Sequence, residues 1–282
     1  MAVTDAVLEW DGGRVRFTST PEPDAWARFV LTDLTGWYGG VGVRDEKWDR
    51  LGHGEARGRT WRGSRALTLK GHVEVDTPEN RDAVMRDLSG VLWNGLEGTL
   101  SATVDGLTLS CPVTLDGEPG VVPSGITAVT VQLPLVSGDP WLFSEWRTSS
   151  IRPIGSGVGL EYPLFTGGVL RYGTAVDSGD VIWNDGNADS WPRFTVHADA
   201  DGGFLVGVGD RALTFPWPVW EDSPATVDTM TGEVLIGGVD QSHRLASREW
   251  TPVLPHSLEA VRFELLQGGT GWCDVSHRDT YI

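Results

Sequence analysis

The sequence predicts a mostly β protein in two halves, with one long helix in the first half. Three observations support this fold class. Apolar residues alternate with polar ones in short runs, turn signals recur about every eight to twelve residues, and one stretch alone has the capping pattern of a helix. The 282 residues include 37 Gly and 16 Pro, scattered among Val, Leu and Thr runs. Such spacing is typical of a β-sandwich or barrel.

Alternation is clearest in the first half of the chain, where apolar side chains occupy every second position as they do in half-buried strands. Asp105-Gly106 interrupts one such run, and because Asp-Gly supplies the positive φ of a tight turn, it predicts a hairpin. The predicted strands are 14–20, 65–75, 99–115 and 128–136.

The stretch from Asp76 to Gly90 departs from this pattern and predicts a helix. Asp76 or Thr77 can cap its first amides, and Gly90 is a good terminator. Val84 and Leu88 lie four residues apart and therefore share one face. The fold is expected to be mostly β with this single long helix.

A boundary between two domains is predicted at SGDPWLFSEWRTSS, 137–150, where turn residues are followed by aromatic and then polar residues. We therefore expect domains at 1–140 and 141–282. The second half repeats the strand-and-turn rhythm. Its predicted strands lie within 167–173, 193–199, 202–215, 225–238 and 259–266.

Charge and composition exclude several classes of protein. The formal net charge is −17, with 13 basic against 20 acidic residues in 1–140 and 9 against 19 in 141–282. Without a basic domain, tight nucleic-acid binding is not expected. No leader-like segment and no apolar run of membrane length occurs, so neither export nor a membrane span is expected. Cys111 and Cys273 are too few for a disulfide framework or a thiolate zinc site, and favour synthesis in a reducing compartment.

The loop NDGNADSWP has the D-x-N-x-D order of a calcium site at Asp185, Asn187 and Asp189. A hand-type calcium loop also requires Gly at its sixth position and Glu at its twelfth, which here are Ser190 and Val196. We therefore interpret the loop as a polar turn that leads into a strand, and expect no metal ligands.

Signatures of catalysis are also missing. The six histidines lack zinc-like spacing, and there is neither a G-x-S-x-G elbow nor a Gly-rich loop followed by a helix with a Lys. Asp139 and Glu145 are the least arbitrary carboxylate pair for glycoside hydrolysis, but they fit solvated turn and strand positions better. We expect no catalytic residues and no cofactor.

Four arginines, Arg57, Arg59, Arg62 and Arg65, gather around Trp61. Arginines that alternate with an aromatic residue can bind nucleic acid. Because the chain is acidic, we expect these guanidinium groups to meet Asp or Glu of a neighbouring subunit instead.

Four stretches, in this order along the chain, resemble the distal tail proteins of siphophages, a family of phage minor tail proteins. They are WRGSRALTLKGHVEV (61–75), SGDPWLFSE (137–145), NDGNADSWPRFTVH (184–197), and VDTMTGEVLIGG (227–238) followed by EWTPVLPHSLEAVRFE (249–264). In the last stretch His256 and Glu259 stand near the places of the family's usual Gly and Asn, which predicts a different backbone at that turn.

The resemblance implies a structural protein of the virion, at the tail tip or baseplate hub, synthesised in the host cytoplasm and without enzymatic activity. Residues 1–140 would form a β-barrel-like belt domain that closes, six copies together, into a ring. Residues 141–282 would form a galectin-like β-sandwich at the periphery of the ring. The ring would join the tail tube protein to the tail hub or tail-associated lysin. The alternative is a carbohydrate- or host-receptor-binding module, with Trp183, Trp217 or Trp220 as its exposed platform.

Overall fold

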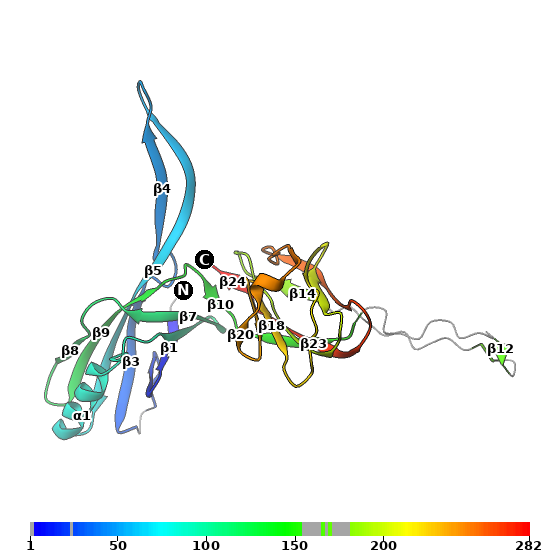
Figure 1. Cartoon of the computed structure of the whole chain (residues 1–282). Coiled ribbons are helices and arrows are strands. Elements are labelled where there is room, and N and C mark those ends of the chain that lie inside the picture. Colours follow the sequence, from blue (N-terminus) through cyan, green and yellow to red (C-terminus); the bar gives the residue numbers. More distant parts are fainter. Residues whose placement is uncertain (1–2, 23–24, 154–164, 167–168, 171–180) are drawn as a thin grey trace. The chain divides into compact units, whose positions relative to one another are not determined.

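The computed structural model describes residues 3–22, 25–153, 165–166, 169–170 and 181–282. They form two compact units, Met1–Glu145 with Ile282, and Trp146–Tyr281. Most described residues lie in strands, and one α-helix follows β5, so the predicted mostly β class is confirmed (Figure 1). Of the strand predicted within 167–173, the residues other than Val169–Leu170 lie outside the described ones.

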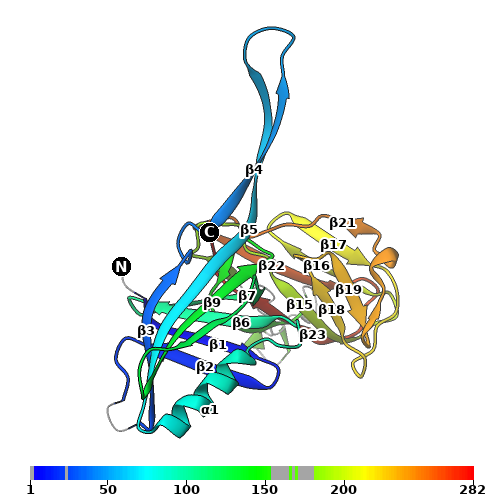
Figure 2. The ribbon, with the colours of Figure 1, turned by 90° about the vertical axis from the view of Figure 1, so that its left-hand side faces the viewer.

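The first unit is a closed barrel with a helix and short flanking strands. Seven strands close it in the order β7-β6-β1-β2-β3-β5-β9, because β9 pairs with β7 as well as with β5 (Figure 2). Neighbouring strands are antiparallel except β2 and β3, which are parallel. The elements are β1 Val3–Trp10, β2 Gly13–Thr18, β3 Ala27–Thr35, β4 Val41–Asp49, β5 Glu55–Val75, α1 Pro78–Ser89, β6 Gly98–Val104, β7 Leu107–Leu115, β8 Gly120–Pro123, β9 Ala128–Ser137 and β10 Leu142–Phe143.

The barrel interior explains the alternation in the sequence. In β5, Leu67, Leu69 and Val73 are buried, while the residues between them are more exposed. Gly71 lies among them because a Cβ there would stand 2.3 Å from the ring of Phe17, which is itself completely buried. The strand therefore needs a glycine where it passes the ring of Phe17.

The helix and the hairpin are confirmed as predicted. Thr77 caps α1 by accepting a hydrogen bond from the amide of Asn80 at 3.2 Å, and Val84 and Leu88 are its buried residues. The helix lies against β5, β8 and β9. Asp105 and Gly106 have φ values of 50° and 85° and join β6 to β7, so this turn has the left-handed backbone that Asp-Gly favours.

The second unit is a sandwich of two antiparallel sheets. One has the order β11-β23-β15-β18-β19-β20 and the other β14-β22-β16-β17-β21. The elements are β11 Arg147–Ile151, β12 Phe165–Thr166, β13 Val169–Leu170, β14 Val181–Asn184, β15 Arg193–Asp199, β16 Phe204–Val208, β17 Arg211–Phe215, β18 Ala225–Asp228, β19 Glu233–Ile236, β20 Val239–Asp240, the 3₁₀ turn η1 Ser242–Arg244, β21 Ser247–Arg248, β22 Ser257–Leu265, β23 Thr270–His277 and β24 Thr280–Tyr281.

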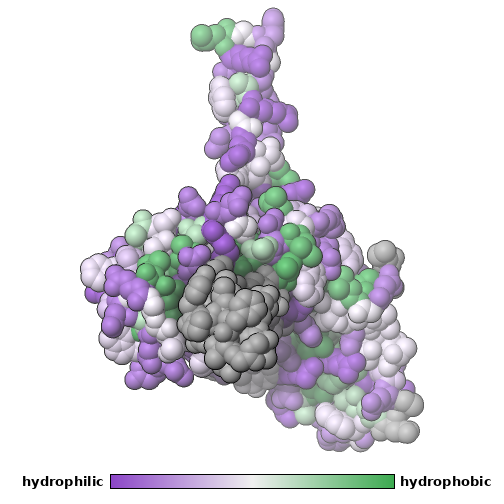
Figure 3. Space-filling view, turned by 90° about the vertical axis from the view of Figure 1, so that its right-hand side faces the viewer, coloured by the Kyte–Doolittle hydropathy of each residue, from purple (hydrophilic) through white to green (hydrophobic). Residues whose placement is uncertain are grey.

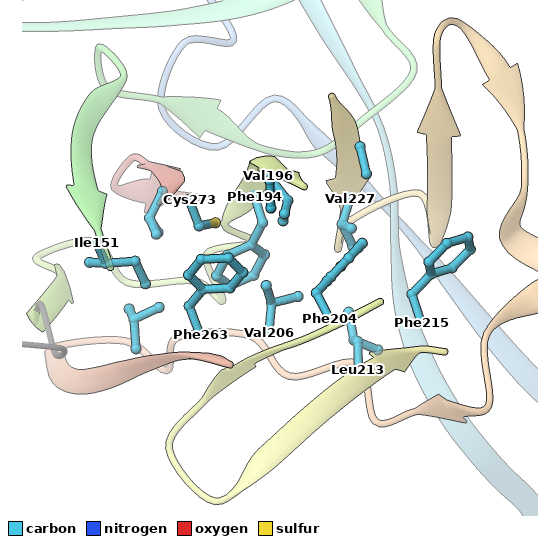
Figure 4. Packing of buried hydrophobic residues seen from close by; sticks show 14 of the residues in the cluster. Ile151, Phe194, Val196, Phe204, Val206, Leu213, Phe215, Val227, Phe263 and Cys273 are labelled. Atoms are coloured by element: carbon cyan, nitrogen blue, oxygen red, sulfur yellow. The ribbon is translucent and has the colours of Figure 1, made fainter. Parts of the chain in front are cut away.

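Apolar side chains from both sheets fill the space between them (Figure 4). Phe194 and Val196 of β15 face Val206 of β16 and Phe263 of β22, and all four are at most 1% exposed. At the turn before β22, His256 has a φ of 53°, the left-handed conformation that a Gly adopts without strain.

The strands that the sequence did not predict are β1, β3, β4, β8, β10, β11, β12, β14, β20, β21, β23 and β24. β4 gave no signal because its residues are nearly all exposed. β5 extends over Glu55–Val75, so the arginine-rich residues 55–64 are part of the strand and do not merely precede it.

Candidate assembly surface

A two-stranded hairpin extends from the barrel wall (Figures 1 and 2). It consists of β4 and the first half of β5, and we call residues 41–64 the arm. Within the described chain β4 pairs with β5 alone. The surface of the arm is mostly hydrophilic, with an apolar spot at its free end (Figure 3). A two-stranded ribbon is marginally stable in water by itself, and among the described residues each strand of the arm leaves its outer edge unpaired.

The two faces of the arm differ. Arg44 is paired with Trp61, and Trp48 with Ala56, so the two tryptophans lie on the same face of the ribbon. Both are about half exposed. The guanidinium of Arg59 lies 5.1 Å from the centroid of the Trp61 ring. This face thus offers aromatic and cationic contacts that the chain itself leaves open to solvent.

The arm is locally basic in an acidic chain. Between residues 43 and 62 it has six basic and four acidic side chains, a net charge of +2, while the whole chain has −17. The ion pairs within the arm are loose, with 3.4 Å between Lys47 and Asp45 and 3.8 Å between Arg57 and Glu55. The arm therefore has a net charge opposite in sign to that of the whole chain.

Arg65 corrects the prediction that all four arginines meet acidic groups of a neighbour. It is 0% exposed and donates to backbone carbonyls of its own unit. Its Nη1 donates to Trp37 O at 2.5 Å and to Gly36 O at 3.2 Å, while Nη2 and Nε donate to Pro140 O at 2.6 and 3.1 Å. Arg65 therefore ties the turn before β4 to the turn after β9, at the base of the arm.

Arg65 and Cys111 are both buried in the first unit. Burial lowers the pKa of its guanidinium, and burial also raises the pKa of the Cys111 thiol to about 12. Cys111 and Cys273 are both free and buried. A thiol with so high a pKa is almost entirely protonated at neutral pH and acts as a small apolar side chain.

A second candidate contact surface lies next to α1. It is a groove of about 410 Å³ lined by Trp10, Trp26 and Trp93, with Val84 and Leu88 of the helix in its wall. Trp26 is 57% and Trp93 79% exposed. Large aromatic side chains exposed around an apolar floor are characteristic of protein contact surfaces.

The carboxylate pair considered for glycoside hydrolysis consists of Asp139 and Glu145. Asp139 lines a shallow pocket at the base of the arm together with Arg62 and Trp141, but the residues that line it do not include Glu145. Nothing in this arrangement matches two carboxylates that face each other across a sugar.

The NDGNADSWP loop is held by Asn184, which is buried in the second unit. Its Oδ1 accepts hydrogen bonds from the amides of Gly186 at 3.0 Å and Thr280 at 3.2 Å. Its Nδ2 donates to Ala188 O at 2.7 Å and Val253 O at 3.1 Å. The turn interpretation is confirmed, because the side chain of Asn184 replaces missing backbone partners.

Two of the three predicted platform tryptophans are already in contact with cations. Trp183 lies under Arg147, 4.7 Å from guanidinium carbon to ring centroid. Trp217 lies under Arg244 at 5.4 Å and donates its Nε1 to Arg244 O at 3.2 Å. Neither ring therefore presents two free faces.

Among the described residues, no group of three or more His, Cys, Asp or Glu side chains is placed to hold a metal ion. In the part of the chain that the structure describes, no helix is long and apolar enough to cross a bilayer.

Comparison with known proteins places the fold among components of phage tails. No family model and no curated protein matches the sequence. Among solved structures, the Dit (gp 19.1) protein of phage SPP1 is similar with a TM-score of 0.64 at 11% identity, over 98% of this chain and 99% of that one. That protein is described as a paradigm of the hub adsorption apparatus in phages that infect Gram-positive bacteria.

A chain of the phage P2 baseplate, solved in its activated conformation with Ca, is similar with a TM-score of 0.53 at 11% identity, over 99% of this chain and 98% of that one. The corresponding Sr structure gives 0.53 and 11% over 97% of each chain. The fold of this chain is thus the barrel-and-sandwich fold of phage Dit and baseplate proteins, in agreement with the resemblance seen in the sequence.

Proposed function

We propose that this chain is a structural protein of a phage tail, a distal tail protein of the baseplate hub, and that it acts in the virion without catalysing a reaction. The observation that carries the proposal is the end-to-end fold likeness. It extends over both units and covers 98% of this chain and 99% of SPP1 Dit. Four sequence stretches that resemble the same family support it independently.

In this proposal the first unit, predicted as the ring-forming domain 1–140, closes with copies of itself into a ring of six. A ring requires heterologous contacts, in which one surface of each copy meets a different surface of the next. The arm and the Trp10–Trp26–Trp93 groove are two such different surfaces. The ring would connect the tail tube protein to the tail hub or tail-associated lysin, with the second unit as the peripheral sandwich.

The acidic character of the chain suits a ring through which DNA passes, because like charges would discourage the DNA from binding. The basic arm must then be covered by protein and not line the channel. A channel lined by Arg57, Arg59 and Arg62 in an assembled ring would contradict this part of the proposal.

The test is the mass of the full chain in solution, measured by light scattering at high micromolar concentration and by negative-stain microscopy. We expect sixfold rings of about six times 30.6 kDa. A variant in which residues 42–63 are replaced by an Asn-Gly turn should remain folded but monomeric. The matched control is Trp217→Ala, an exposed tryptophan of the second unit, which should leave the rings intact. A native chain that stays monomeric and forms no ring when mixed with tail tube protein would overturn the proposal.

A further inference from the structure

Trp220 differs from the other two platform candidates of the second unit. Its side chain is 48% exposed, and within the described chain no aromatic ring or guanidinium covers it. It follows Val219, which is 1% exposed and fixed in the core. The indole is therefore displayed at the surface from a rigid base.

Trp220 borders two adjoining hollows of about 320 and 460 Å³, and both are also lined by Asp199. We call them together the Trp220 pocket. Asp201, Gln267 and Gly268–Gly269 complete the first hollow, and Glu221 and Asp222 the second. Both hollows are open to solvent, so a ligand there would lie on the surface of the unit with one side exposed.

The wall of the Trp220 pocket is held by several bonds. Ala200 and Val219 exchange two backbone hydrogen bonds of 3.1 Å, and the Asp199 carboxylate accepts from the Glu221 amide at 2.9 Å. The stem of Gln267 lies directly over Gly202, where a Cβ would stand 2.4 Å from its Cγ. The Asp199 carboxylate and the backbone beside Trp220 are therefore positioned before any ligand arrives, while the Gln267 amide lies at the surface.

We propose that the Trp220 pocket binds a neutral pyranose unit of a glycan. The apolar CH face of a pyranose ring can pack on the free face of the indole, and the glycines beside it leave space for the ring. The Gln267 amide can both donate to and accept from hydroxyl groups. The Asp199 and Asp201 carboxylates can accept from hydroxyls in charge-assisted hydrogen bonds.

The negative charge of the Trp220 pocket determines which glycans it can bind. The pocket is lined by four carboxylates, from Asp199, Asp201, Glu221 and Asp222, and by no Lys or Arg. Sialylated, uronic or phosphate-bearing polymers would be repelled. A protein lysine could use the indole and a carboxylate, but it would leave Gln267 and the space over Gly268–Gly269 without partners. The pocket therefore fits a neutral sugar better than a cationic side chain.

The experiment is a glycan array probed with the full chain, followed by calorimetry with the strongest neutral oligosaccharide. We expect neutral hexose or N-acetylhexosamine chains to bind and acidic glycans to be absent among the hits. Trp220→Ala should weaken binding at least about tenfold, Gln267→Ala should weaken it less, and Trp217→Ala should leave it unchanged. Circular dichroism confirms that each variant is folded.

Three results would overturn the inference: no neutral glycan bound at millimolar concentration, binding that survives Trp220→Ala, or a lysine-rich peptide bound through Trp220 where glycans are not. The inference does not rest on the proposed ring function. Trp220→Ala should keep the sixfold mass, so failure of one proposal is distinguishable from failure of the other.

Discussion

The two halves of β5 are one continuous strand in two different environments. Residues 65–75 form part of the barrel wall, pair with both β3 and β9, and bury every second side chain. Residues 55–64 belong to the arm, pair with β4 and with no other described strand, and bury no side chain. The comparison shows that an alternating pattern reports burial on one side of a strand, not the strand itself.

The largest expected difference between the two environments is in thiol reactivity. Cys111 lies in the barrel with its pKa raised to about 12 by burial, whereas a cysteine introduced at the arm tip by Leu51→Cys would be exposed. From the thiolate fraction at pH 8, we expect Cys111 to react about 1000-fold more slowly. Disulfide-exchange kinetics of the two proteins check this. Comparable rates would show that the barrel opens easily.

The second-largest difference between the two halves of β5 is expected for side-chain truncation. Leu69 is completely buried between Leu34 and Leu133, so Leu69→Ala should lower the free energy of unfolding by about 2–5 kcal/mol. Trp48→Ala in the arm should change it by less than about 0.5 kcal/mol in the monomer. Urea unfolding of the native chain and of the two variants, below the concentration of assembly, measures both values. A large loss for Trp48→Ala would mean that the arm packs on its own barrel.

Arg65 stands where the two halves meet, and its exposed neighbour Arg62 is the matched control. Arg65→Ala leaves carbonyls of Trp37 and Pro140 without donors in a buried place, and should cost about 2 kcal/mol. Arg62→Ala should cost less than about 0.5 kcal/mol. Thermal unfolding decides between them, and equal losses would contradict the assigned role of Arg65.

The smallest effects come from adding one methyl group to each half. Gly71→Ala would press on the buried ring of Phe17 and should destabilise by about 1–2 kcal/mol. In the arm, the Cβ of Gly58→Ala would stand 2.7 Å from Glu46 Oε2, 3.0 Å from Glu46 Cβ and 3.1 Å from Cζ3 of Trp48. Since both side chains are exposed and the ribbon can adjust around them, we expect a change within about 0.5 kcal/mol, measured by the same unfolding experiment.

The sequence predicted well those elements whose pattern arises from local chemistry. The cap at Thr77, the Asp105-Gly106 turn and the buried alternation of 65–75 each depend on neighbouring residues. β4 was missed because both of its faces are exposed, and the sequence alone does not reveal the chain that would cover it.

The candidate surfaces were less accessible to sequence reasoning. The cluster around Trp61 was noticed, but Arg65 was grouped with it although it points into the protein. Its role depends on the turns at Gly36–Trp37 and Pro140, which are distant in the sequence. The Trp220 pocket likewise needs Asp199, Gln267 and Trp220 together, which only the folded sandwich provides.

The continuity of β5 has a mechanical consequence. A pull along the arm would load the hydrogen bonds from Arg65 to Glu74 with β9, and those with β3, in shear and all at once. Strands loaded in shear separate only when many hydrogen bonds break together, whereas strands pulled apart from one end lose their hydrogen bonds one at a time. The arm is therefore suited to carry tension into the barrel wall.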